Sequence, residues 1–454
     1  MLIGVQEGRL LADDYRSIAD ALAADIQVGR LPPGAQLPPQ RVFAYERGIA
    51  ASTAGRVYTE LRRRGLVSGE VGRGTFVRNS REPVESALID PRLTPVNLEL
   101  VFAVLDEHRP LLANSLTRLA QGAVFFDALK PVGAASPAAA RAVAARFLER
   151  PDWTPGAGQV LFAGNGKQAL AAALSAIAEP GSRLGVEPLT YPVIKTVAAR
   201  LGVELVPISM DSRGLLPDEL DNVLSRGRLS GIYLQTSAQS PTGVTMPVER
   251  RMAVARVLQR HDVVAIEDGI YHFLVDELPL AAFAPGHVIF VDSLSKRLAP
   301  GLALGVIASP NHLVENVAAA IRRGVWMPNG LALALGVYWM GAPELGRIIA
   351  DKQADARARQ VVARETLESF AIGGDDRAYH LWLPLPDHWR SEAFAAAALR
   401  QGIAVAPGSA FAVQPGHAPN GVRLALGAVA GTELKAVLER VRGLALGGEE
   451  GLIE

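Results

Sequence analysis

The sequence predicts an α/β protein with a mostly parallel sheet, preceded by a small domain of three helices and a β-hairpin. Short β-rich runs alternate with Ala-rich helical stretches, which is the pattern of a parallel sheet covered by helices. Seven such runs lie at 160–162, 183–187, 203–207, 231–234, 263–267, 288–291 and 304–308. After about position 345 the pattern changes to a long helix followed by short strands and helices, which predicts a smaller α+β lobe.

The composition is that of a globular protein. Of 454 residues, 49% are hydrophobic and 20% charged, and the formal net charge is zero. The absence of cysteine excludes disulfides, thiolate metal sites and a cysteine nucleophile, and no metal site is expected. The N-terminus has no basic leader, and the longest apolar stretch, 331–342, is far shorter than the ~20 residues of a membrane span. We therefore expect a soluble, cytoplasmic protein without a membrane partner.

The small domain is predicted from a run of helix signals. Apolar residues at helical spacing follow Asp13 or Asp14, and the prolines of 31–39 form a turn. A short second helix runs from Gln40 to Arg47, and a third begins with Ser52 or Thr53 as its cap. Two β-rich runs broken by glycines in 66–77 then predict a hairpin. The order is that of a winged helix-turn-helix.

The charge distribution supports DNA binding by this domain. Residues 41–78 contain eight arginines and three glutamates, an excess of five positive charges in a neutral chain. A solvated helix face would also carry such charge. The arginines, however, fall on the third helix and in the hairpin, which are the parts of a winged helix-turn-helix that reach DNA.

The predicted domain boundaries follow from these patterns. Residues 1–78 form the DNA-binding domain, and 79–96, with three prolines and little periodicity, form a linker. Residues 97–454 form the body, with a large lobe of about 97–345 and a small lobe of about 346–454.

Two strand ends in the body carry the strongest chemical signals. Lys296 follows a predicted strand at the sheet edge where α/β proteins build their sites, between Ser293, Ser295 and a Pro-Gly turn. A lysine that forms a Schiff base must be neutral, and Arg297 is the expected cation that favours this form. Asp268 ends another strand, where a carboxylate can hold a cationic ring N–H or simply cap a helix. Tyr271, three residues later, is placed to bind a phenolic oxygen.

Weaker signals lie at other predicted turns. Gly166 and Lys167 stand in a strand-to-helix turn whose N–H groups suit a phosphate. Tyr191 follows a strand end and is either a ring-stacking or a packed aromatic residue. Ser240 lies in the turn QSPTG, and Arg423 is either a carboxylate clamp or a surface ion-pair partner.

The order of these motifs resembles that of fold-type I aminotransferases, which use pyridoxal 5′-phosphate (PLP). The motifs are GNGKQAL, TYP, SPTG, ED-x-x-Y, SLSK, APG and VRLAL. The first 78 residues resemble the winged helix-turn-helix of the GntR family, and the combination resembles the MocR family of bacterial transcriptional regulators. The resemblance covers nearly the whole chain.

The resemblance implies a role for each matching residue. Lys296 is the Schiff-base lysine, Asp268 pairs with the pyridine nitrogen, Tyr271 binds the ring oxygen, and Tyr191 stacks on the ring. Gly166, Lys167, Ser293 and Ser295 lie near the phosphate, and Arg423 binds the carboxylate of a substrate or effector. The residues that match the DNA-facing part of the head are Arg41, Ser52, Thr53, Arg56, Arg73 and Gly74.

The chain departs from the family pattern at four places. The phosphate-binding arginine that usually follows the lysine by seven residues is Ala303 here, and we expect Arg297 to replace it. Ser240 replaces a common asparagine that contacts the ring oxygen. In the head, Ala50-Ala51 replaces the usual Ser-Arg, and Gly55 lies inside the third helix. We therefore expect an operator sequence different from the usual GntR one.

The resemblance predicts a PLP-dependent transcriptional regulator and leaves two alternatives open. The head binds double-stranded operator DNA, and the body senses PLP, or an amine or amino acid that reacts with it, and forms a homodimer. One alternative is an active aminotransferase with a fused DNA-binding head, because the catalytic residues are all present. The other is a regulator whose body has lost PLP and serves only in dimerisation, which Ala303 and Ser240 favour.

Overall fold

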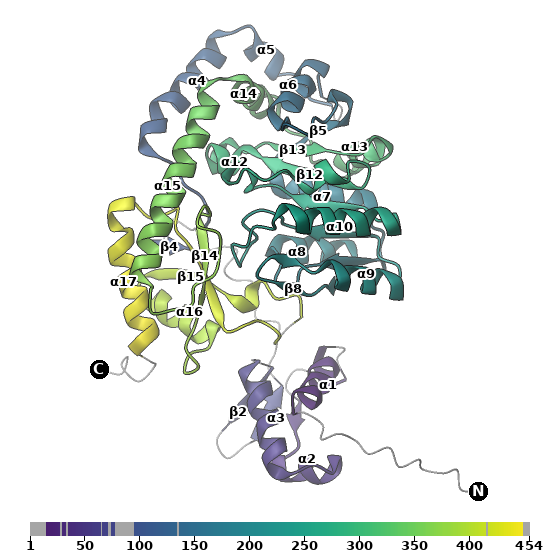
Figure 1. The fold of residues 1–454 in the computed structure, drawn as a ribbon, viewed down its shortest axis with the longest axis vertical. Coiled ribbons are helices and arrows are strands. Elements are labelled where there is room, and N and C mark those ends of the chain that lie inside the picture. The colour runs from purple at the N-terminus through teal and green to yellow at the C-terminus, as the bar shows by residue number, and fades with distance from the viewer. Residues whose placement is uncertain are drawn as a thin grey trace, which may run out of the picture. The chain divides into compact units, whose positions relative to one another are not determined.

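The computed structural model describes residues 15–27, 30–32, 35–64, 66–70, 74–77, 95–133, 136–414 and 416–447. By its internal contacts the chain divides into two units (Figure 1). The first comprises Met1–Leu93 with Gln414–Ala418, and the second comprises Thr94–Val413 with Pro419–Glu454. The predicted linker lies outside the described residues up to position 94, and so do Asp13 and Asp14.

The N-terminal domain is a winged helix-turn-helix, as predicted. Its elements are α1 (Tyr15–Gln27), β1 (Gln36–Leu37), α2 (Gln40–Arg47), α3 (Ala51–Arg63), β2 (Val67–Glu70) and β3 (Gly74–Val77). The hairpin of β2 and β3 gains a third strand, because β1 pairs antiparallel with β3. The sequence did not predict β1, since a strand of two residues between prolines has no periodicity to detect.

One face of α3 builds the core of this domain. Ala54, Val57, Tyr58 and Leu61 are fully buried, at the spacing of a single helical face. The ring of Tyr58 meets that of Phe43 of α2 edge to face, with centroids 5.4 Å apart. The opposite face of α3 is thereby left at the surface of the domain.

The large lobe is built on a seven-stranded sheet, as predicted (Figure 1). The strand order is β5-β13-β12-β11-β10-β6-β7, and β13 is antiparallel to both of its neighbours. The strands are β5 (Val160–Ala163), β6 (Arg183–Val186), β7 (Glu204–Pro207), β10 (Gly231–Leu234), β11 (Ala265–Asp268), β12 (Val288–Ser293) and β13 (Gly305–Ala308). A two-stranded hairpin is formed by β8 (Met210–Asp211) and β9 (Gly214–Leu215).

Helices cover both faces of this sheet, which explains why its strands read as continuous apolar runs. In β12, Ile289 and Val291 belong to one buried cluster, whereas Val288 and Phe290 belong to the other. The helices of this lobe are α4 (Arg109–Gln121), α5 (Val124–Ala128), α6 (Ala138–Leu148), α7 (Gly166–Ile177), α8 (Pro192–Leu201), α9 (Pro217–Arg226), α10 (Val248–His261), α11 (Leu280–Phe283), α12 (Leu294–Arg297), α13 (Val314–Arg323) and α14 (Gly330–Gly341).

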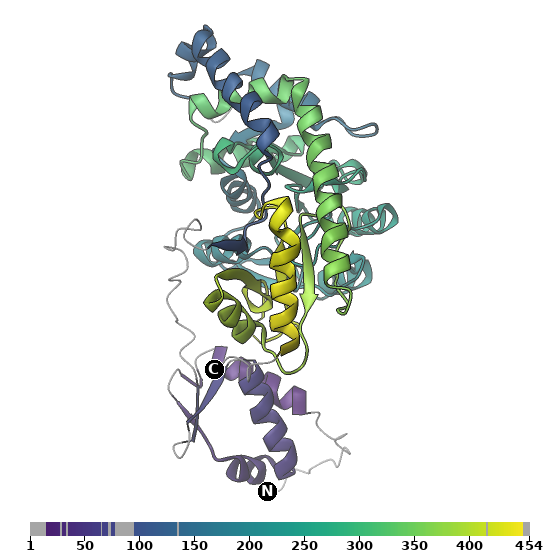
Figure 2. The same ribbon diagram turned by 90° about the vertical axis from the view of Figure 1, so that its left-hand side faces the viewer.

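The small lobe is a four-stranded sheet packed against helices. Figure 2 shows its long helices running alongside the sheet. Its strands, in the order β14-β16-β15-β4, are β14 (His380–Pro384), β16 (Gly421–Ala425), β15 (Ile403–Pro407) and β4 (Val96–Leu98). Its helices are α15 (Glu344–Thr366), α16 (Ser391–Arg400) and α17 (Gly431–Gly447). Because β4 pairs with β15, the expected start of the large lobe at 97 falls inside a strand of the small lobe. Among the described residues, no helix is long and apolar enough to cross a bilayer.

Candidate cofactor site and nucleic-acid interface

A cavity of about 460 Å³ lies in the body where several strands of the large sheet end. Parallel strands bring their carboxyl ends to one edge, which is where α/β proteins bind ligands. The predicted site residues that line it are Gly166, Lys167, Tyr191, Ser240, Asp268, Tyr271, Ser295, Lys296 and Arg423. Motifs more than 250 positions apart in the sequence therefore meet around one space.

Lys296 lies in α12, directly after β12, and its Nζ donates to the carbonyl oxygen of Val101. Burial and the nearby charges of Arg423 and Lys167 together lower the pKa of Lys296 to about 8. A substantial fraction of the side chain is therefore neutral near physiological pH, which is the form that attacks an aldehyde.

The predicted role of Arg297 is contradicted by its position. Its guanidinium is buried and donates to the carboxylate of Asp292. It also lies over the rings of Phe147 and Phe273, 4.9 and 5.1 Å from their centroids. Arg297 is absent from the cavity lining and is held inside the lobe. It therefore does not replace the missing phosphate arginine, and the cations that act on Lys296 are Arg423 and Lys167 instead.

Asp268 is a buried carboxylate at the end of β11 that lines the cavity. Its Oδ2 accepts from the hydroxyl of Tyr233 at 2.8 Å and from Nε2 of Gln235 at 3.0 Å. Burial raises the pKa of Asp268 to about 6, although these hydrogen bonds oppose the increase. Neutral donors orient the group and leave its negative charge poorly compensated, so a cationic ring N–H fits it.

Two buried tyrosines line the cavity next to Asp268. Tyr271 packs on the ring of His380, with centroids 5.4 Å apart, and burial raises its pKa well above the ordinary value. Burial also raises the pKa of Tyr191, to about 12. Both rings are therefore protonated phenols at neutral pH, able to donate a hydrogen bond or to pack against a planar ligand.

The start of α7 forms one end of the cavity. Oδ1 of Asn165 accepts from the N–H of Gln168 at 2.9 Å and so caps the helix. A Cβ at Gly166 would lie 3.1 Å from Cβ of Ser293, so a glycine lets this turn approach β12 closely. The hydroxyls of Ser293 and Ser295 are 2.7 Å apart. Ser295, Lys167 and the helix N-terminus line the cavity and together suit a phosphate. The predicted Ser293 is buried outside the lining and bonds to Ser295.

Arg423 lies at the far end of the cavity, on β16 of the small lobe. It donates to Oγ of Ser240 at 2.9 Å and to the carbonyl oxygen of Glu99, and it lies 4.9 Å from the ring centroid of Phe411. Its Nε is buried and has no hydrogen-bond partner among the described residues. A carboxylate suits this incompletely satisfied cation.

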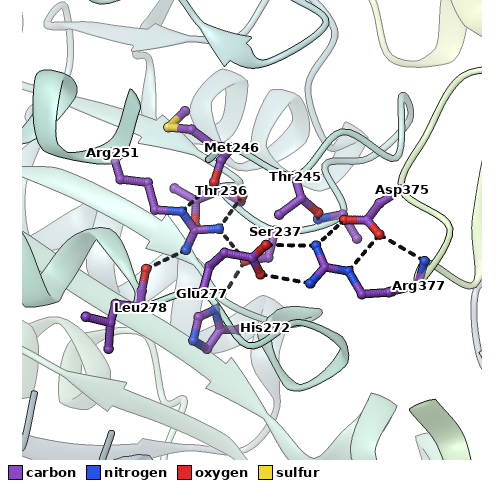
Figure 3. Close-up of polar contacts among 11 residues, drawn as sticks. Thr236, Ser237, Thr245, Met246, Arg251, His272, Glu277, Leu278, Asp375 and Arg377 are labelled. Atoms are coloured by element: carbon purple, nitrogen blue, oxygen red, sulfur yellow. Dashed lines mark hydrogen bonds and ion pairs between the residues drawn. The ribbon is translucent and has the colours of Figure 1, made fainter. Parts of the chain in front are cut away.

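A polar network supports the turn that carries Ser240 (Figure 3). The fully buried Arg251 donates to the carbonyl oxygens of Thr236 at 2.9 Å and Met246 at 2.8 Å, which flank this turn. Arg377 of the small lobe pairs with Glu277 of the large lobe, with an N···O distance of 2.8 Å. The network ties the two lobes together next to the cavity. Like Tyr233 and Gln235, these residues have no local sequence signature.

Ala303, the position of the missing arginine, also lines the cavity. We expect Ala303→Arg to tighten PLP binding by at least about tenfold, because a charge-assisted contact contributes roughly 1.5–3 kcal/mol. Equilibrium titration of PLP by fluorescence measures the change. Ala303→Met is the control, since it fills space without charge. Equal affinity of the two variants would contradict the assignment of this end of the cavity to the phosphate.

Most of the predicted DNA-facing residues of the head are accessible among the described residues. Arg41, Ser52 and Arg56 are exposed, and Thr53 is half-buried. The predicted capping of α3 by Ser52 or Thr53 is wrong, because the helix begins at Ala51 and its N-cap, Ala50, makes no side-chain cap bond. Arg73 lies outside the described residues, and Gly74, with φ of +122°, begins β3.

Residue Thr59 of α3 was missed by the sequence analysis. It is exposed and follows Ser52 and Arg56 at helical spacing, on the face opposite the core. A strip of hydroxyls around an arginine on a helix can contact phosphates and base edges. Within the described part of the chain, no group of His, Asp and Glu side chains is arranged to hold a metal ion.

Two family models match the chain. Residues 131–441 match the aminotransferase class I and II family, and residues 14–77 match the gntR family of bacterial regulatory proteins. The HTH-type transcriptional regulator YdeF of Bacillus subtilis is 30% identical over 404 residues, covering 88% of this chain and 87% of YdeF. The vitamin B6 salvage pathway transcriptional repressor PtsJ of Salmonella typhimurium is 29% identical over 429 residues, covering 92% and 96%.

Solved structures show the same fold for the body. An archaeal alanine:glyoxylate aminotransferase superposes with a TM-score of 0.72 at 19% identity, covering 80% of this chain and 92% of the enzyme. A multiple substrate aminotransferase from Thermococcus profundus gives 0.70 at 22% identity, covering 77% and 91%.

Proposed function

Because the chain belongs to the MocR family, in which a GntR-type helix-turn-helix precedes an aminotransferase class I and II domain, we propose that it is a PLP-dependent regulator of transcription. The observation that carries this proposal is the cavity that unites Lys296, Asp268 and Arg423 in a chain with a DNA-binding head. Such a protein acts where the chromosome is, in the cytoplasm.

The residues around the cavity fit PLP at each of its functional groups. When bound, PLP supplies an aldehyde that captures amines and a ring that withdraws electrons. Lys296 holds the aldehyde carbon, and Asp268 holds the ring N–H and its proton. Tyr191 would pack on the ring and exclude water from it, and the hydroxyl of Tyr271 would donate to the ring oxygen. The phosphate would meet Lys167, Ser295 and the N-terminus of α7, and Ser293 would act through its hydrogen bond to Ser295.

Arg423 defines the class of effector. Its buried guanidinium lies in the same cavity as Lys296, so a ligand that reaches both carries an amine and a carboxylate, as an amino acid does. Such a ligand changes DNA binding only if it binds the DNA-competent and DNA-free states with different affinity. A ligand amine that competed with Lys296 for the aldehyde would leave Lys296 free to bind a proton, which would change the charge of the site and provide such a difference.

The head binds duplex DNA through α3, with Arg56 as its central cation. We expect Arg56→Ala to weaken operator binding and to make its salt dependence less steep by about 0.9 per lost phosphate contact in a log–log plot. Anisotropy titrations of the upstream DNA of the gene at several salt concentrations measure both quantities. Arg400→Ala, which removes an exposed arginine of α16, is the charge-matched control. An unchanged slope in Arg56→Ala would exclude this face of α3.

Dimerisation is proposed through apolar side chains of the large lobe. The exposed ones on α4, α5 and α14 are Leu116, Val124, Phe126 and Leu331, and Leu129 directly follows α5. Exposed apolar residues gathered in this way are typical of an interaction surface. A homodimer places two heads on two half-sites, each bound weakly alone, so the isolated head is expected to bind poorly. Light scattering of the full chain tests the assembly.

Aminotransferase turnover is the second candidate function. The arrangement of Lys296, Asp268 and Arg423 in one cavity favours it, because these groups also serve transamination. Multiple-turnover assays with paired amino and keto acids distinguish the two functions. A regulator without turnover converts at most one equivalent of amino acid per bound PLP.

A further inference from the structure

A second buried lysine lies behind the cavity and has no part in the proposed binding of PLP. Lys352, on α15, is fully buried. Its Nζ donates to the carbonyl oxygen of Lys296 at 2.9 Å and to that of Leu298 at 2.8 Å. Both carbonyls belong to the last residues of the α12 turn, where a cation compensates unpaired carbonyl dipoles. Lys352 thus fixes the backbone of Lys296 itself.

The charges of the two lysines decide which of them loses its proton first. Burial and the charge of Lys296 together lower the pKa of Lys352 to about 7, although Asp355 opposes the decrease. Because the pKa of Lys296 is about 8, Lys352 loses its proton first and is mostly neutral while Lys296 titrates. The charges that favour the neutral form of Lys296 are Arg423 and Lys167, and Asp268 opposes them. Lys352 therefore acts on Lys296 through its hydrogen bonds rather than through its charge.

The helix that carries Lys352 is itself anchored to the site. The hydroxyl of Tyr379 donates to the carbonyl oxygen of Lys352 at 2.8 Å. The next residue, Gln353, donates from Nε2 to the carbonyl oxygen of Phe273 at 2.7 Å. Phe273 lies two residues after Tyr271. One turn of α15 therefore holds two segments of the site. One carries Lys296, which is assigned to the PLP aldehyde, and the other carries Tyr271, which is assigned to the ring oxygen.

We propose that Lys352 is a positioning residue that holds the α12 turn and so orients Lys296 for covalent capture of PLP, an inference that rests on the proposed function. In this capture the Nζ lone pair of neutral Lys296 attacks the aldehyde carbon. A C=N bond replaces the C=O bond, and the two amine protons leave with the aldehyde oxygen as one water. A protonated Lys296 has no lone pair and must first lose a proton.

The test measures the rate of adduct formation after PLP is mixed with the full-length apo protein, by absorbance, between pH 6 and 9. Borohydride reduction followed by intact mass measurement confirms the site of attachment. The variants are Lys352→Met, which removes both donors and charge, Lys352→Gln, which retains a donor, and Lys352→Arg, which retains both. Lys195→Met is the matched control, because Nζ of the half-buried Lys195 also donates to two carbonyls, of Ala410 and Ala412, at another place in the fold.

In Lys352→Met we expect capture to be ~tenfold slower across the pH range, because the turn that carries Lys296 is no longer held, while the midpoint of the pH–rate profile stays that of the wild type. Lys352→Arg, which retains both donors, rescues the rate, Lys352→Gln is intermediate, and Lys195→Met retains the wild-type rate. If Lys352→Met does not fold, the comparison of the Gln and Arg variants decides. Equal rates of capture in the Gln, Arg and wild-type proteins would overturn the role of Lys352. Absence of any adduct in the wild-type protein would instead overturn the proposed function.

Discussion

Replacement of Lys296 by alanine is expected to abolish the covalent attachment of PLP completely. Lys296 lines the cavity beside Asp268 and Tyr271, and burial gives its amine a pKa of about 8. Nucleophilic capture of an aldehyde needs this amine, and after the substitution no amine remains at this position of the cavity. Intact mass after borohydride reduction measures the result as the loss of one cofactor adduct per chain.

The fold should survive this substitution, because it removes a buried cation whose desolvation is unfavourable. Circular dichroism and thermal unfolding of the apo protein check this point. Lys195→Met serves as the control that loses one half-buried lysine and retains the adduct. A borohydride-stable adduct in Lys296→Ala would show that another lysine captures PLP.

Replacement of Asp268 by asparagine is expected to weaken PLP binding and to remove the fall in PLP affinity at acidic pH. The pKa of Asp268 is raised to about 6 in the folded apo protein, so the carboxylate that pairs with the ring N–H is lost as the pH falls below this value. Wild-type affinity for PLP should therefore fall between pH 7 and 5, and that of Asp268→Asn should change little. Equilibrium dialysis across this range measures the difference, and parallel pH profiles would contradict the pairing.

The same substitution should stabilise the apo protein at neutral pH. A carboxyl whose pKa is raised on folding makes the protein less stable as the pH rises from the unfolded value near 4 to the folded value near 6. The difference between the two pKa values lowers the free energy of unfolding by roughly 3 kcal/mol above about pH 6. Asp268→Asn should therefore have a higher melting temperature than wild type at pH 7.5, with the gain lost near pH 4. A lower melting temperature at pH 7.5 would show that the hydrogen bonds to Asp268 outweigh the cost of its burial.

The fold was predictable because its strands are buried on both faces and stand out as apolar runs. All seven predicted runs overlap strands of the large sheet, such as 288–291 with β12 (Val288–Ser293). The predicted α2 coincides with Gln40–Arg47, since Gly48 adopts the left-handed conformation that ends it. The elements missed were those without periodicity, such as β1 and β4, which have two and three residues and depend on partners far along the chain.

The site was predictable where a motif lies directly after a strand, as Lys296 and Asp268 do. The error at Arg297 arises from helical geometry. Adjacent residues of a helix point roughly 100° apart, so when Lys296 faces the cavity, Arg297 faces the core. Tyr233 lies inside a strand and Lys352 inside a long helix, and neither position has a local signature. Their contacts exist only after β10 and α15 pack against the segments that carry Asp268 and Lys296.

The central claim is that one chain couples amine chemistry at Lys296 to DNA binding by its head. The most direct test is the operator affinity of full-length wild type and Lys296→Ala, measured by anisotropy at fixed salt without PLP, with PLP, and with PLP plus each member of an amino-acid panel. We predict that PLP or one amino acid changes the affinity of the wild-type protein and leaves that of Lys296→Ala unchanged, because only covalent exchange distinguishes the two states. Identical operator affinity of the wild-type protein under all conditions would contradict the account.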